Sequence, residues 1–323
     1  MLESLLQRFH QGDRQALSRL LTLLAHGDKR EEILGHLPVL KKLSRIVALT
    51  GAGGVGKSTL AGRLIELARR QGQTVAVLAC DPRSPLSGGA LLGDRFRMPA
   101  EPDDGVFIRS LATPSAQGTV PKCVPALLQV LEAFGFDLLI VETVGAGQGD
   151  TGVRDFADVV VLLLQPETGD DIQWEKAGLL EVADLVVIHK ADLPGADLAE
   201  AQLRAGQELS GDRAPPILRV SAKTGEGIEE LWKAISACPL RREMESSEDL
   251  DLLRLAQATL ARWFAQAESN QDASLRHLIH QWHQGVLTQG EATSALIHLL
   301  EKEYGSLPQV KRRPSSGRNH PGP

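Results

Sequence analysis

The sequence predicts an α/β fold, in which a mostly parallel sheet is covered by helices and carries further helices at both ends. Two observations predict this class. Between residues 45 and 240, short apolar segments alternate with longer segments of helical character, which is the pattern of a parallel sheet covered on both faces. Most of the short segments are continuous runs of Val, Ile and Leu rather than alternating patterns, as strands buried on both faces should be.

Seven segments are predicted as strands of this sheet. They are Ile46 to Leu49, Val75 to Ala79, Val106 to Arg109, Leu138 to Val141, Val159 to Leu164, Leu185 to His189 and Ile217 to Val220. In an open α/β sheet the ligand binds beyond the carboxyl ends of the strands. We therefore expect the functional residues directly after these segments.

Composition limits the class of protein. The chain has 323 residues, of which 42% are hydrophobic and 24% charged, values that are ordinary for a globular domain with helical additions. The net charge of −6 does not favour non-specific binding to nucleic acid. No apolar run approaches the roughly 18 residues of a membrane span, so we expect neither a nucleic-acid nor a membrane partner.

The cysteines and the opening segment indicate a cytoplasmic protein. Cys80, Cys123 and Cys238 are odd in number, far apart and without a C-x-x-C pair, which favours a reducing compartment over a disulfide or structural zinc framework. Met1 to His10 already carries charged residues and is not a signal peptide.

Four regions are predicted along the chain: a helical extension over 1–44, a main domain over 45–240, a helical arm over 241–306 and a disordered tail over 307–323. In the first region Leu17, Leu20, Leu21 and Leu24 have the spacing of one helix face. That face packs either on the chain's own core or on a partner. The tail is predicted to be disordered because it is rich in Pro, Ser, Gly and Arg.

The stretch GAGGVGKST follows the first strand and fits the phosphate-loop pattern G-x-x-x-x-G-K-[ST]. Its residues are Gly51, Ala52, Gly53, Gly54, Val55, Gly56, Lys57, Ser58 and Thr59. Glycines let backbone N–H groups turn onto phosphate oxygens, Lys57 reaches the terminal phosphates and the Ser58 hydroxyl can ligate Mg²⁺. The same glycines also spell G-x-G-x-x-G, so a dinucleotide site is the alternative at this point.

Two acids follow later strands. Asp81 ends the second segment and could hold a metal-bound water or orient an attacking water. Glu142 comes directly after the fourth segment, and Gly145 lies three residues further along. This spacing is typical of a γ-phosphate sensor, in which the carboxylate addresses the metal and the glycine N–H contacts the terminal phosphate.

The sixth and seventh segments end in motifs that indicate guanine. His189, Lys190 and Asp192 stand where guanine-specific GTPases usually have N-K-x-D, with an aspartate that accepts from the N1 and N2 hydrogens of the base. His189 replaces the usual Asn. The seventh segment is followed by Ser221, Ala222 and Lys223, which match the S-A-K loop of such GTPases. A dinucleotide site explains none of these motifs, so GTP or GDP is the predicted ligand.

The strings DPRSPLSGGALLGDRFRM, VETVGAGQ and TGDDIQWEKAG, together with the phosphate loop, resemble the methylmalonyl-CoA mutase-associated GTPases over nearly the whole chain. This resemblance implies a P-loop GTPase chaperone that gates cofactor loading of an adenosylcobalamin-dependent acyl-CoA mutase and helps to remove damaged cofactor. It also implies Mg²⁺ coordination near Ser58, Asp81, Asp94 and Glu142. Lys176 matches the lysine that the family uses when the mutase accelerates hydrolysis.

The last region is predicted to hold amphipathic helices, one of which begins with a capping box of Thr288 and Glu291. The resemblance implies that this region forms a homodimer. His277, His280 and His283 recur at a spacing of three, which favours a solvated helix face over a metal site. Two other functions stay open: a transport-associated kinase acting on a binding protein, and a metal-delivery GTPase.

Overall fold

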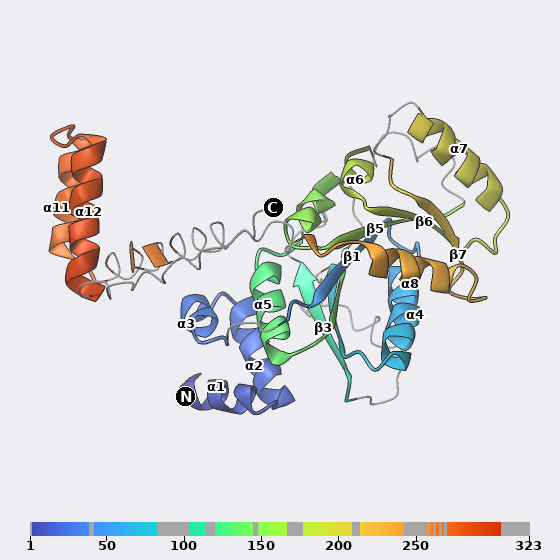
Figure 1. Ribbon diagram of the computed structural model, residues 1–323, viewed down its shortest axis with the longest axis horizontal. Helices are drawn as coiled ribbons and strands as arrows, with labels where there is room; N and C mark the ends of the chain where they lie inside the picture. The colour runs from blue at the N-terminus through green and yellow to red at the C-terminus, as the bar shows by residue number, and fades with distance from the viewer. Residues whose placement is uncertain are drawn as a thin grey trace, which may run out of the picture. The chain divides into compact units, whose positions relative to one another are not determined.

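The computed structural model divides the chain into two compact units, Met1–Glu245 and Ser246–Pro323. The first unit contains the sheet and the second a helical hairpin (Figure 1). The structure describes residues 2–38, 42–82, 104–113, 120–144, 148–166, 177–208, 214–241 and 270–304, with positions 256, 259, 260, 263, 264 and 267.

The first unit is built on a seven-stranded sheet in which every strand pair is parallel. The strands are β1 (Arg45–Gly51), β2 (Val75–Pro82), β3 (Val106–Thr113), β4 (Leu138–Glu142), β5 (Val159–Leu164), β6 (Leu185–His189) and β7 (Ile217–Val220). Their order across the sheet is β3-β2-β4-β1-β5-β6-β7. The predicted α/β class and all seven predicted strands are confirmed.

Alternate residues of the strands build two separate cores. Val47 and Leu49 of β1 belong to the cluster that holds α4 (Lys57–Arg70) and α8 (Ile228–Ala237). Ile46 and Ala48 belong to the cluster on the opposite face. Because successive side chains of a strand point to opposite faces, a strand covered on both sides needs an unbroken apolar run. This is why the pattern of the sequence predicted the sheet.

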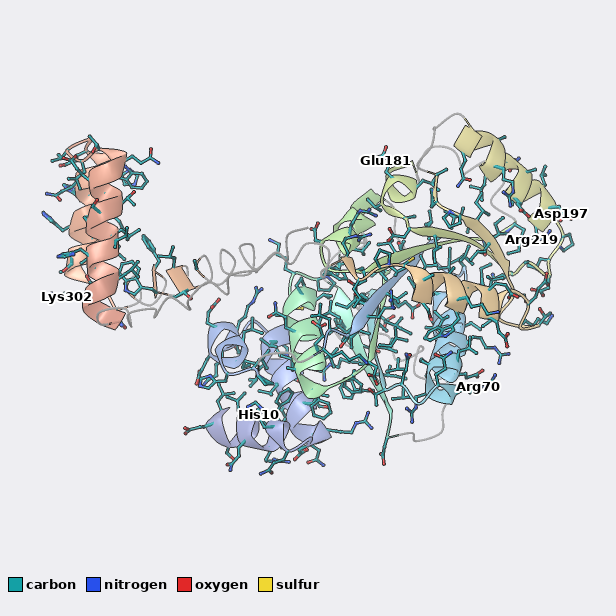
Figure 2. The ribbon with its side chains drawn as sticks, in the orientation of Figure 1. His10, Arg70, Glu181, Asp197, Arg219 and Lys302 are labelled. Atoms are coloured by element: carbon teal, nitrogen blue, oxygen red, sulfur yellow. The ribbon has the colours of Figure 1, made fainter. Side chains whose placement is uncertain are left out.

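The opposite face of the sheet is covered by the N-terminal helices and by helices from the middle of the first unit. They are α1 (Leu2–His10), α2 (Arg14–Ala25), α3 (Arg30–Gly35), α5 (Val124–Phe134), α6 (Ala177–Val182) and α7 (Ala196–Glu208). A short 3-10 helix, η2 (Gln148–Asp155), precedes β5. The ion pair between Asp197 of α7 and Arg219 of β7, both labelled in Figure 2, fastens α7 to the edge strand.

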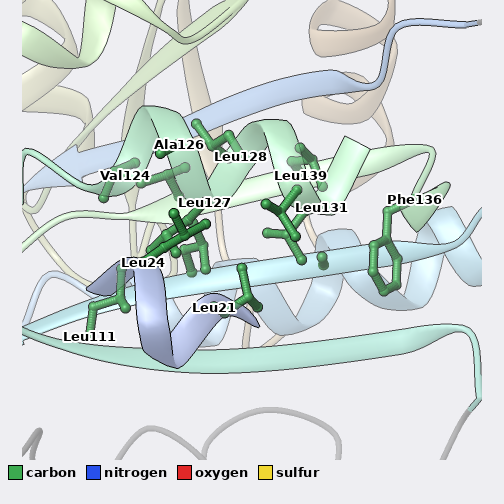
Figure 3. Packing of buried hydrophobic residues seen from close by; sticks show 14 of the residues in the cluster. Leu21, Leu24, Leu111, Val124, Ala126, Leu127, Leu128, Leu131, Phe136 and Leu139 are labelled. Atoms are coloured by element: carbon green, nitrogen blue, oxygen red, sulfur yellow. The ribbon is translucent and has the colours of Figure 1, made fainter. Parts of the chain in front are cut away.

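Helix α2 packs on the chain's own core, the first of the two alternatives left open by its leucine spacing. Leu17, Leu20, Leu21 and Leu24 are all buried. Figure 3 shows Leu21 and Leu24 in the same cluster as Leu127 of α5. The helix begins at an Asp13 cap, whose carboxylate accepts from the N–H groups of Gln15 and Ala16. The N-terminal helices are therefore part of the first unit's core.

Strand β3 is longer than its sequence predicted. The apolar pattern ends at Arg109, but the strand continues to Thr113 because it pairs with β2 from Val75↔Val106 to Pro82↔Thr113. The added residues Ser110 to Thr113 contain two apolar residues between two polar ones and form neither a continuous apolar run nor a strict alternation, so their pattern alone was too weak to extend the strand.

The second unit contains α11 (Ala273–His283) and α12 (Gln289–Tyr304), with a small core around Trp263, Ala267 and Leu275. The predicted capping box at the start of α12 is confirmed: Thr288 Oγ1 and the Thr288 N–H both donate to Glu291 Oε2, at 2.7 and 2.8 Å. No helix in the described part of the chain is long and apolar enough to cross a bilayer.

Candidate functional site

Five of the strands end at two neighbouring cavities. The larger, of about 440 Å³, is lined by Gly53, Gly54, Gly56, Lys57, Ser58, Thr59, Cys80, Asp81, Glu142, Thr143, Val144 and Lys190. The smaller, of about 260 Å³, is lined by Gly56, Thr59, His189, Lys190, Asp192, Leu193, Ser221, Ala222 and Lys223. Gly56, Thr59 and Lys190 line both cavities. Phosphate-loop and base-motif residues predicted from separate parts of the sequence thus meet at one edge of the sheet.

The phosphate loop depends on glycines for its path. Gly51, Gly54 and Gly56 have φ values of 141°, 76° and 103°, a region that L side chains rarely adopt. At Gly51 a Cβ would also collide with the carbonyl oxygen of Leu163 on β5. Lys57, the first residue of α4, is buried, and its ammonium group donates to the carbonyl oxygens of Gly51 and Ala52 at 2.9 and 3.1 Å.

Oxygen ligands suitable for a magnesium ion gather in the larger cavity. Ser58 Oγ donates to Glu142 Oε1 at 2.6 Å, and Asp81 lines the same cavity. All three side chains are buried. Hydroxyl and carboxylate oxygens are the ligands that Mg²⁺ takes, usually together with phosphate oxygens. The donor set at the ends of β2, β4 and the phosphate loop therefore fits this ion.

The described residues hold no cluster of three or more His, Cys, Asp or Glu side chains suited to bind a metal by itself. This applies to the three histidines of α11, where His277, His280 and His283 are exposed. A magnesium ion in the larger cavity would therefore need Ser58 and the phosphates of a bound nucleotide as ligands beside Asp81 and Glu142.

The smaller cavity presents a charged acceptor. Ser221 Oγ donates to Asp192 Oδ1 at 2.6 Å, and this bond lowers the pKa of the Asp192 carboxyl. Lys223 Nζ lies 3.9 Å from Asp192 Oδ2. Ser221 is itself fixed, since its N–H donates to the Glu226 carbonyl at 2.9 Å. An ionised carboxylate only accepts hydrogen bonds, which complements the adjacent N1 and N2 hydrogens of guanine.

His189 and Lys190 join the smaller cavity to the phosphate loop. His189 is buried, and its Nδ1 lies 2.7 Å from the carbonyl oxygen of Val55. Lys190, at a left-handed φ of 57°, donates from Nζ to the Gly54 carbonyl and to Gln165 Oε1, both at 3.0 Å. The last residue of β6 and the first residue after it thus hold two successive carbonyls of the phosphate loop.

Three predicted site residues, Asp94, Gly145 and Lys176, lie outside the described residues. The structure also adds residues that sequence reasoning missed. Leu193 lines the smaller cavity, and Gln165 at the end of β5 binds Lys190. The only feature of the sequence that could have indicated Gln165 is its position directly after the carboxyl end of β5. No feature of the sequence indicated Leu193.

Comparisons with known proteins agree with this geometry. The family model described as methylmalonyl Co-A mutase-associated GTPase MeaB matches residues 17–273. A putative GTPase of Pyrococcus abyssi is 44% identical over 243 residues, covering 73% of this chain and 75% of the relative. The fused isobutyryl-CoA mutase of Cupriavidus metallidurans is 40% identical over 238 residues, covering 69% of this chain and 22% of the relative.

A further relative and a solved structure extend the comparison. The mitochondrial methylmalonic aciduria type A homolog of Mus musculus is 36% identical over 231 residues, covering 69% of this chain and 55% of the relative. The crystal structure of a LAO/AO transport system kinase superposes with a TM-score of 0.58 and 26% identity, covering 93% of this chain and 97% of that one. The phosphate loop, the base motifs and the family match agree: the chain is a P-loop GTPase that belongs to the methylmalonyl-CoA mutase-associated GTPase family.

Proposed function

We propose that this GTPase is a chaperone for an adenosylcobalamin-dependent acyl-CoA mutase, gating the loading of intact cofactor and the removal of damaged cofactor. The observation that supports it most is the fused isobutyryl-CoA mutase, in which a segment 40% identical to this chain forms part of the mutase polypeptide. Joining two proteins in one chain fixes a high effective concentration of each for the other. Such a fusion favours a GTPase whose function requires repeated contact with the mutase.

GTP would bind across the two cavities, with guanine in the smaller and the phosphates in the larger. Asp192 accepts from the base, and Lys57 together with the loop N–H groups stabilises the phosphate charge. Ser58, Asp81 and Glu142 would hold Mg²⁺, with Asp94 as a further ligand. The ion, when bound, neutralises charge on the phosphates and fixes their orientation.

Two predicted residues would link the nucleotide to the partner. The N–H of Gly145 would contact the γ-phosphate, so that its segment changes position when that phosphate is lost. Lys176 would act in hydrolysis when the mutase is bound. Position 146 is alanine where many GTPases place a water-orienting glutamine. We therefore expect slow turnover by the protein alone and faster turnover with its partner.

Affinity capture from an extract of the native organism tests the proposal. The full chain is immobilised with a non-hydrolysable GTP analogue, with GDP or without nucleotide, and bound proteins are identified by mass spectrometry. We expect an adenosylcobalamin-dependent mutase whose recovery depends on the nucleotide. The Lys57→Ala variant is the control and should lose that dependence. Absence of any mutase, or equal recovery in every arm, contradicts the chaperone function.

A hydrolysis assay tests the chemistry separately. Because Lys57 lies at the phosphate loop and its charge is needed in the transition state, Lys57→Ala should lower the GTPase rate by about 100-fold or more. Removal of Mg²⁺ with a chelator should lower the wild-type rate in the same way, and added Mg²⁺ should restore it. A variant as fast as the wild type would refute the proposed mechanism.

A further inference from the structure

His189 stands in a motif predicted to recognise the base, yet its ring makes a hydrogen bond with the phosphate loop. Its Nδ1 lies 2.7 Å from the Val55 carbonyl oxygen, an atom that only accepts hydrogen bonds. Nδ1 must therefore carry the proton. In the neutral ring Nε2 is then an acceptor without a hydrogen. Nε2 is buried and has no hydrogen-bond partner within the described part of the chain.

The surroundings of His189 keep the ring neutral and in place. Burial lowers the pKa of the imidazole, and the nearby charge of Lys190 adds to this, while the Val55 bond and the charge of Asp192 act in the opposite direction. The ring also packs directly on Gly56. A Cβ at Gly56 would lie 2.5 Å from Cε1 and 2.6 Å from Nδ1 of the ring, closer than real side chains approach.

The bond from His189 completes a set of carbonyl contacts along the phosphate loop. Lys57 Nζ holds the carbonyls of Gly51 and Ala52, Lys190 Nζ holds that of Gly54, and His189 holds that of Val55. In a trans peptide the C=O and the following N–H point in opposite directions. Fixing the Val55 carbonyl therefore fixes the Gly56 N–H on the side away from the imidazole.

We propose that His189 is a positioning residue for the nucleotide phosphates, acting through the Val55–Gly56 peptide, and that it is not a donor to the base. The proposal rests on the GTP-binding part of the proposed function. Guanine recognition is then left to Asp192, whose carboxylate is held by Ser221. His189 instead supplies the hydrogen bond that keeps the loop in its phosphate-binding shape.

Two variants separate the ring from its hydrogen bond. His189→Phe keeps a ring but has no donor, and His189→Asn loses the ring but can donate from its amide. Affinities are measured for GMP and GDP, which differ in phosphate number and share the base. We expect His189→Phe to weaken GDP about 10-fold and GMP less than about 3-fold. His189→Asn should regain most of the GDP affinity.

The base contact has its own control. Asp192→Asn should weaken GMP and GDP by the same factor, since it changes only base recognition. If His189→Phe also weakens both nucleotides equally, or leaves GDP unaffected, the proposed role of His189 is wrong. Failure of the wild-type chain to bind GDP at all would instead overturn the proposed GTP-binding function.

A measurement on the unmodified protein covers the case in which His189→Phe does not fold. The ¹⁵N chemical shifts of the two ring nitrogens report which one carries the proton. We expect the Nδ1–H tautomer at neutral pH, both without nucleotide and with GDP bound. The Nε2–H tautomer would overturn the proposal, because that ring could not donate to the Val55 carbonyl.

Discussion

At the residue scale, the proposed recognition of guanine rests on the charge of a single carboxylate, that of Asp192. The Ser221 hydroxyl holds Asp192 at 2.6 Å and lowers its pKa, so the group stays ionised at neutral pH. In the proposed pose it accepts two hydrogen bonds from guanine, a pair of donors that adenine lacks. Rejection of this kind is strong because a wrong base leaves polar groups unpaired.

Asp192→Asn should therefore change the preferred base. An amide presents one donor and one acceptor in place of two acceptors, so we expect GTP affinity to fall by about 10- to 100-fold. Xanthosine triphosphate, with a carbonyl in place of the 2-amino group, should bind the variant better than it binds the wild type. Competition against a fluorescent nucleotide measures both changes, and unchanged GTP affinity would contradict the role of Asp192.

His189 should make stability depend on pH. Because burial lowers its pKa in the folded state, the unfolded chain binds more protons at this position below about pH 6.5. Stability from this residue is therefore lost as pH falls below that value and is constant above it. Urea unfolding at about pH 7.5 and about pH 5.5 should show a larger loss for the wild type than for His189→Asn. Equal losses would contradict the buried, neutral imidazole.

At the element scale, α2 belongs to the core of the GTPase unit. Leu20 is fully buried in the cluster that α2 shares with α5. Leu20→Ala should lower the free energy of unfolding by about 2 to 5 kcal/mol, because it removes buried methyl groups and leaves a cavity. Leu198, 63% exposed on α7, is the matched control. Leu198→Ala should change stability by less than about 0.5 kcal/mol, and equal effects would show that α2 does not pack as described.

Asp184, which directly precedes β6, connects η2 and β5 to the C-terminal part of the first unit. Arg241 Nη2 donates to both oxygens of Asp184 at 2.8 and 2.9 Å. Asp184 Oδ2 also accepts from the Val160 N–H at 2.8 Å, and Arg154 of η2 approaches Asp184 Oδ1 at 3.4 Å. One carboxylate thus satisfies donors from three separate parts of the chain.

Asp184→Ala should destabilise the protein by about 2 to 3 kcal/mol, because partly buried donors lose their acceptor. The exposed pair of Lys29 and Glu32, at 3.3 Å, is the control. Glu32→Ala should cost less than about 1 kcal/mol, as exposed ion pairs usually do. Chemical denaturation measures both values. If Asp184→Ala lowers the free energy of unfolding no more than Glu32→Ala does, the hydrogen bonds of Asp184 do not stabilise the protein as described.

At the scale of the whole molecule, the nucleotide site belongs to one unit. Every residue that lines the two cavities lies in Met1–Glu245, and this unit has its own cores. The second unit has a separate small core and exposes large apolar side chains, among them Trp282 at 56% and Ile297 at 51%. We propose, as the family resemblance implies, that the C-terminal region forms a homodimer.

A fragment of residues 1–245 tests this division. We expect it to unfold cooperatively and to bind GDP within about 3-fold of the full chain's affinity, because no residue of the cavities is lost. Sedimentation should show a monomeric fragment and a dimeric full chain. A dimeric fragment would place the dimer interface in the first unit, and loss of GDP binding would show that the site needs the second.

The sequence predicted the sheet and most of the site for local reasons. Buried parallel strands need continuous apolar runs, so all seven could be found in order, and Gly51 to Thr59 form a contiguous motif whose backbone shape depends on its own glycines. The capping box of Thr288 and Glu291 was equally local, since its bonds span three residues. The last residues of β3 were missed because only pairing with β2 extends that strand.

By itself the sequence determined the fold class, the phosphate loop and the preference for guanine, because each is written in neighbouring residues. Only the tertiary structure decided what those motifs contact. It placed α2 on the core, tied Lys190 to Gln165 and directed His189 to the Val55 carbonyl, a residue 134 positions away. Contacts between distant segments depend on the spatial order of the strands in the sheet. No pattern of neighbouring residues specifies that order.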